Sequence, residues 1–130
     1  MRLSYVIVYV KNVLETVDFY QKAFGLKHRF THESGAYAEM ETGQTTLAFV
    51  SEEMAKDSHS FRLNRTTEKP PGIEISLVTD HVQKQFDQSV EAGAIPVVKP
   101  TQKPWGQLVS CVKDNNGCLV EICSPIDIPS

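Results

Sequence analysis

Residues 4–26 read SYVIVYVKNVLETVDFYQKAFGL, a short apolar run followed by a longer, periodic one. The first run, 4–10, is β-branched and aromatic without a polar face, which favours a strand. Asn12 is an expected N-cap, and Gly25 is a suitable residue to end a helix. Between them apolar residues recur with the spacing of one helical face, at Val13, Val17, Tyr20 and Phe24.

The residues after this helix predict three more strands. They are expected at 26–31, 36–41 and 45–50, with turns at Ser34-Gly35 and Thr42-Gly43. The first half of the chain therefore has the predicted order β-α-β-β-β.

The second half repeats this order. Strands are expected at 73–78, 95–98, 107–113 and 118–123, and a helix follows the expected N-cap Asp80 and ends at Gly93. One offset of 68 positions relates Tyr5, Asn12 and Gly25 to Ile73, Asp80 and Gly93. A later offset of 74 relates Gly43 to Gly117. The shared offset indicates an internal duplication.

The predicted fold class is α+β, with two βαβββ modules and mixed, mostly antiparallel sheets. Its expected parts are a first module (1–51), a connecting flap (52–71), a second module (72–125) and a tail (126–130). One helix covers only one face of each sheet, so the other face is expected to curl around a cavity or meet a partner. Strand alternation assigns to that face Tyr5, Ile7, Tyr9, Leu47, Phe49, Ile73, Ile75, Leu77, Leu119, Glu121 and Cys123.

Composition narrows the possible partners of the protein and its cellular compartment. The chain has 130 residues and a net charge of −3, and its Lys and Arg residues are scattered, which argues against a nucleic-acid partner. Its longest apolar run, Tyr5 to Val10, is far below the roughly 20 residues that a membrane helix needs, and no signal peptide is visible. Three cysteines without a CxxC motif favour a reducing compartment, so we expect a cytoplasmic protein without a membrane partner.

Two segments carry a family resemblance: TVDFYQKAFGL at 16–26 and DNNGCLVEI at 114–122. With the repeat, they make the chain resemble the vicinal-oxygen-chelate superfamily, which includes glyoxalase I, bleomycin- and fosfomycin-resistance proteins and extradiol dioxygenases. The resemblance covers nearly the whole chain and implies paired βαβββ modules, usually in a homodimer, that enclose a ligand site. It specifies a fold and not an activity, because the fold hosts many chemistries.

The resemblance also implies metal ligands on the first and last strands of each module. Carried over to this chain, those positions are Tyr5, Leu47, Ile73 and Glu121, of which only Glu121 is a usual ligand. Glu74 is adjacent to one position, but alternation is expected to point it at the helix. A catalytic zinc takes three protein ligands, so we expect no divalent metal and no other cofactor.

Each candidate site residue has two interpretations. Glu121 is either a base or hydrogen-bond acceptor in the cavity, or a remnant acid in a structural network. Tyr5, Tyr9 and Phe49 either stack on a ligand or pack in a core or interface. Trp105 is either a wall over the ligand or a hydrophobic plug for its loop. Leu47 and Ile73 are expected to line the same cavity, whereas Glu39 is expected to be solvated.

Two functions follow from this set. The first is metal-free binding of a small, partly apolar or aromatic molecule, as in bleomycin-resistance-like sequestration or sensing. The alternative is a glyoxalase-like lyase or isomerase, or a dioxygenase relative, that uses Glu121 as base or metal ligand. The sequence leaves open whether the protein is an enzyme.

Overall fold

The computed structural model describes residues 1–126, so 127–130 of the expected tail (126–130) lie outside the described residues. The chain divides into two compact units, 1–64 and 65 onward. The first contains β1 (Tyr5–Val10), α1 (Val13–Phe24), β2 (Lys27–Thr31), β3 (Tyr37–Glu41), β4 (Thr46–Ser51) and α2 (Glu52–Ala55). The second contains β5 (Glu74–Val78), α3 (Val82–Glu91), β6 (Ile95–Gln102), β7 (Leu108–Lys113) and β8 (Leu119–Cys123).

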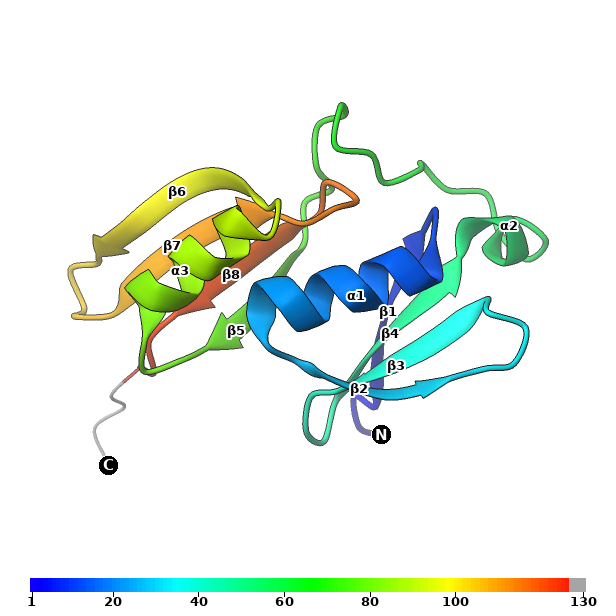
Figure 1. Cartoon of the computed structure of the whole chain (residues 1–130), viewed down its shortest axis with the longest axis horizontal. Helices are drawn as coiled ribbons and strands as arrows, with labels where there is room; N and C mark the ends of the chain where they lie inside the picture. The colour runs from blue at the N-terminus through cyan, green and yellow to red at the C-terminus, as the bar shows by residue number, and fades with distance from the viewer. Residues whose placement is uncertain (127–130) are drawn as a thin grey trace. The chain divides into compact units, whose positions relative to one another are not determined.

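Each unit is one four-stranded sheet with a helix across one face (Figure 1). The strand orders are β1-β4-β3-β2 and β5-β8-β7-β6. In each sheet the first and last strands of the unit pair in parallel, and the remaining pairs are antiparallel. The predicted α+β class with two βαβββ modules is therefore confirmed, and each sheet is open rather than closed into a barrel. No helix in the described part of the chain is long and apolar enough to cross a membrane.

The long helix of the first unit begins and ends as predicted. The Asn12 side chain accepts a hydrogen bond from the Glu15 amide at 3.0 Å, and Gly25 ends α1 with φ +67°. The buried face of α1 packs on the sheet, where the rings of Tyr20 and Phe49 lie 4.9 Å apart. Both Leu47 and Phe49 are buried on this helix-covered face. The prediction that they share the open face with Tyr5 is wrong.

The duplication is offset by 69 residues at the first strand and helix, and not by 68. Helix α3 begins at Val82 with His81 as N-cap, so Val13 and Val82 correspond, and the predicted cap Asp80 is one residue too early. Consequently Tyr5 corresponds to Glu74, and Ile73 precedes the strand. Because strand side chains alternate, this one-residue error exchanges the two faces of β5.

The turn between β7 and β8 explains the second family-like segment. The buried Asp114 carboxylate accepts hydrogen bonds from the amides of Asn116 (2.8 Å) and Cys118 (2.9 Å). Gly117 has φ +86°, and a Cβ there would overlap the carbonyl oxygen of Arg65. The geometry of this turn therefore lets the chain that leads into β5 pack closely against it.

The predicted flap contains the one-turn helix α2 and then a segment that packs on the edge of the first sheet. The ring of Phe61 lies 4.7 Å from that of Tyr9, and His59 lies 6.0 Å away. The Asn64 side-chain amide donates to the Tyr9 carbonyl oxygen at 3.0 Å. This part of the flap therefore belongs to the first unit.

Replacing Gly117 by Ala should destabilise the second unit by about 3 kcal/mol, because left-handed strain and a backbone clash add. Urea unfolding of the full chain, followed by circular dichroism, measures this change. Gly43→Ala is the matched control, since Gly43 has φ +96° but no atom within 4 Å of a Cβ. It should cost about 1 kcal/mol. Equal losses in the two variants would contradict the close approach of Arg65.

Candidate functional site

The open face of the second sheet carries two carboxylates. Glu74, Ser76 and Val78 are exposed along β5, while Ile75 and Leu77 are turned inward. In the sheet register Glu121 on β8 lies between Ser76 on β5 and Cys111 on β7. The expectation that Glu74 points at the helix is therefore wrong. Sequence reasoning missed Glu74 because its repeat alignment was displaced by one residue.

Glu121 accepts a hydrogen bond from the Ser76 hydroxyl at 2.6 Å. It also lies beside Glu74, whose pKa is raised by burial first, and then by the charge of Glu121 and a hydrogen bond to it. The two carboxyl groups thus form one acidic pair on the open face of the second sheet.

Two thiols flank this carboxyl pair. The pKa values of Cys111 and Cys123 are raised, chiefly by burial, and Glu74 and Glu121 add to both shifts. Cys123 Sγ also lies 3.5 Å from the Ser76 hydroxyl. Such thiols stay protonated, so they contribute apolar surface and weak hydrogen bonding and are poor nucleophiles.

The described residues do not fit a catalytic metal site. Within residues 1–126 no group of three or more His, Cys, Asp or Glu side chains is arranged to hold an ion. Glu74 and Glu121 supply two carboxylates, whereas a catalytic zinc takes three protein ligands and water. We therefore derive no reaction step through a metal.

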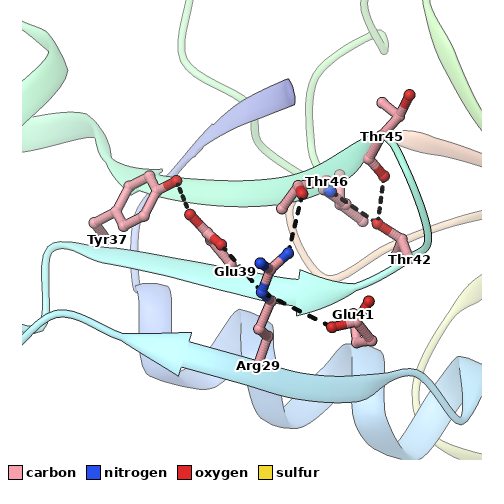
Figure 2. Close-up of polar contacts among 8 residues, drawn as sticks. Arg29, Tyr37, Glu39, Glu41, Thr42, Thr45 and Thr46 are labelled. Carbon is pink, nitrogen blue, oxygen red and sulfur yellow. Dashed lines mark hydrogen bonds and ion pairs between the residues drawn. The ribbon is translucent and has the colours of Figure 1, made fainter. Parts of the chain in front are cut away.

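The open face of the first sheet carries a different polar group (Figure 2). Glu39, only 15% exposed, accepts a hydrogen bond from the Tyr37 hydroxyl at 2.6 Å. Arg29 approaches from β2, with Nε 3.7 Å from Glu39 and 3.8 Å from Glu41. Its Nη1 donates to the Thr46 hydroxyl at 3.4 Å. Glu39 is therefore anchored rather than solvated, contrary to expectation. Along β3 the apolar residues Ala38 and Met40 are buried and alternate with Tyr37, Glu39 and Glu41. This alternation is the signal in the sequence that could have placed Glu39 on the open face.

The remaining predicted residues lie in different surroundings. Tyr5 is on the open face of the first sheet and 51% exposed, whereas Tyr9 is half-buried under Phe61. Ile73 precedes β5 and is 70% exposed. Trp105 lies in the β6–β7 hairpin, 63% exposed, and donates from Nε1 to the Gln107 side chain at 2.9 Å.

Comparison with known proteins agrees with this architecture. Residues 2–122 match the family described as Glyoxalase/Bleomycin resistance protein/Dioxygenase superfamily, so the chain belongs to that superfamily. No curated protein matches the sequence significantly.

Solved structures show the same fold at low identity. A glyoxalase-related enzyme from Fulvimarina pelagi superposes with a TM-score of 0.81 at 17% identity, over 96% of this chain and 88% of that one. A glyoxalase/bleomycin resistance protein/dioxygenase family enzyme from Burkholderia phytofirmans PsJN superposes with a TM-score of 0.73 at 19% identity, over 95% of this chain and 98% of that one. TioX from Micromonospora sp. ML1 superposes with a TM-score of 0.72 at 19% identity, also over 95% of this chain and 98% of that one. These likenesses establish the fold alone.

Tyr37 should ionise unusually late. Burial, the hydrogen bond to Glu39 and the charge of Glu39 raise its pKa to about 12. Because the folded pKa lies above the ordinary value of 10.0, the stabilisation is complete below pH 10 and lost as the pH rises toward 12. Absorbance at 295 nm should show a phenolate transition near pH 12 that is missing from Tyr37→Phe. Glu39→Gln should move it to lower pH. An unchanged titration in Tyr37→Phe would contradict the assignment.

Replacing Glu74 by Gln should raise the melting temperature at pH 7–8, because it removes a charge beside Glu121 and keeps a donor. The raised pKa of Glu74 favours folding at low pH and loses that benefit as the pH rises through the folded pKa. The gain should therefore vanish near pH 4. For a partly exposed pair it should stay below about 1 kcal/mol. Glu68→Gln, an exposed acid of the same unit, is the control. An equal gain at both pH values would count against the pair.

Proposed function

We propose that this superfamily member binds a small, partly aromatic molecule without a resident metal, as a sequestering or sensing protein of the bleomycin-resistance type. The observation that carries the proposal is the Glu74–Glu121 pair on the open face of the second sheet. The pair offers negative charge and several acceptor lone pairs. It suits a ligand that brings an ammonium or another strong donor.

The surroundings of the pair support an amphipathic ligand. The open face of β5 and β8 carries the acids Glu74 and Glu121, while the alternate residues of both strands point toward the helix. Val78 at the end of β5 and Leu119 at the start of β8 lie on the same open face as the acids. Val78 is 63% exposed, and the protonated thiols of Cys111 and Cys123 add soft apolar surface. An apolar body with a cationic or donor group matches this pattern better than an anion does.

We further propose that the protein works as a cytoplasmic homodimer. The free cysteines 111, 118 and 123 fit a reducing compartment. Tyr5, Val6 and Ile7 are exposed on the edge strand β1 of the first sheet, which is an unusual concentration of apolar surface for a monomer. We propose neither a nucleic-acid nor a membrane partner.

Calorimetric titration of the metal-free protein with a panel of aromatic amines, starting with metal-free bleomycin, tests the binding function. We expect saturable binding at one molecule per site, with the ligand recovered unchanged. Glu121→Gln should weaken it about tenfold, because a charge-assisted hydrogen bond is lost. Glu68→Gln should not. Lack of saturation across the panel, or binding equally weakened by both variants, would defeat the proposal.

A second candidate is a glyoxalase-like lyase or isomerase, or a dioxygenase relative. The same pair favours it, because the Glu121 carboxylate can take a proton from a carbon beside a carbonyl and return it to the oxygen. General acid–base catalysis of this kind supplies about 10²–10⁴-fold. Turnover of the methylglyoxal–glutathione adduct, lost in Glu121→Gln, would favour this enzyme over a binding protein. Turnover only after addition of a divalent metal would make Glu121 a ligand.

A further inference from the structure

A polar pocket lies on the first unit, at the end of its sheet where the β3–β4 turn meets residues 2–5. Its volume is about 860 Å³. Two arginines, Arg2 and Arg29, line it together with the hydroxyl-bearing residues Ser4, Tyr5, Thr45 and Thr46. No acidic residue is among its lining residues. The charged side chains that line the pocket are therefore both cations.

The sheet holds Arg29 in a defined position. The β2–β3 register shifts between His28 and Phe30, so Arg29 lies in a bulge, a feature that redirects a side chain. Glu39 and Glu41 lie near its Nε, and its Nη1 is directed to Thr46, which lines the pocket (Figure 2). The two glutamates thus lie on the Nε side of the Arg29 guanidinium, and its Nη1 faces the pocket residue Thr46.

The two glutamates leave Arg29 able to bind an anion. Their oxygens lie 3.7 and 3.8 Å from Nε, beyond hydrogen-bond distance, and Glu41 is half exposed and therefore screened by solvent. One carboxylate oxygen of Glu39 already accepts from Tyr37. Arg2 is exposed and has no ion pair among residues 1–126. An anion at 2.8 Å from a guanidinium would form shorter, charge-assisted contacts.

We propose that this pocket binds an oxyanion, the phosphate or carboxylate group of a small molecule, between Arg29 and Arg2. The Thr46 hydroxyl, which accepts from Arg29, has its own proton to donate to the anion. Arginine suits this chemistry because its planar fork matches two oxygens of such a group. The pocket uses no residue of the Glu74–Glu121 pair.

Calorimetric titration of the full chain with inorganic phosphate, and separately with succinate, tests this site at low ionic strength. We expect saturable binding of one anion per chain in at least one arm, and the tighter arm identifies the phosphate or carboxylate class. Arg29→Gln and Arg2→Gln should each weaken binding about tenfold. Glu41→Gln should tighten it about threefold, because it removes a competing charge.

Lys11→Gln is the matched control, because it removes the same charge from an exposed residue of the same unit outside the pocket. The affinity of this variant for the anion should stay within about twofold of that of the unmodified chain. Absence of saturable binding in both arms, or equal weakening by Lys11→Gln, would overturn the oxyanion site. If Arg29→Gln does not fold, Arg2→Gln, in the exposed N-terminal segment, still decides the question. The lining of this pocket includes neither Glu74 nor Glu121, and its probes are anions rather than amines, so this site and the proposed function fail independently.

Discussion

The parallel pairing of the first and last strands within each unit is the constraint on which the functional surface depends. Opposite residues of paired strands project to the same face, so this register decides which side chains meet. Ser76 opposite Glu121 brings the second unit's acids together, and Ile7 opposite Ala48 leaves the matching place in the first unit apolar. The helix then buries the alternate residues, and the acids Glu39, Glu74 and Glu121 lie on the open faces.

The two units use the same framework for different chemistry. Glu39 lies opposite Ala48 in the first sheet, as Cys111 lies opposite Glu121 in the second. Glu39 of the first unit lies on β3, next to the parallel pair of β1 and β4. Glu121 of the second unit lies on β8, within the parallel pair of β5 and β8. The hydrogen-bond donor to Glu39 is Tyr37, and Arg29 lies nearby. In the second unit the neighbour is Glu74, whose pKa is raised by burial and by Glu121.

Local patterns in the sequence were sufficient for the fold but not for the faces of every strand. The helix from Val13 to Phe24 was predictable because its cap, its apolar spacing and Gly25 agree. The face of β5 was not, because the repeat was aligned through Asp80 when the cap is His81. Leu47 and Phe49 were misassigned for a related reason: β4 is buried from Thr46 to Phe49, so its alternation carries no signal. A strand buried on both faces shows its orientation only through its neighbours.

The closeness of Glu74 and Glu121 gives the carboxyl pair a definite preference among ligands. Two acids that repel each other gain from a nearby positive charge, because a cation stabilises the ionised carboxylates. A divalent ion would need further ligands that residues 1–126 do not group around the pair. An ammonium group needs only acceptors, and Glu74 and Glu121 supply them beside the apolar side chains of Val78 and Leu119. Two carboxylates beside apolar side chains therefore suit an organic cation, in keeping with the proposed ligand.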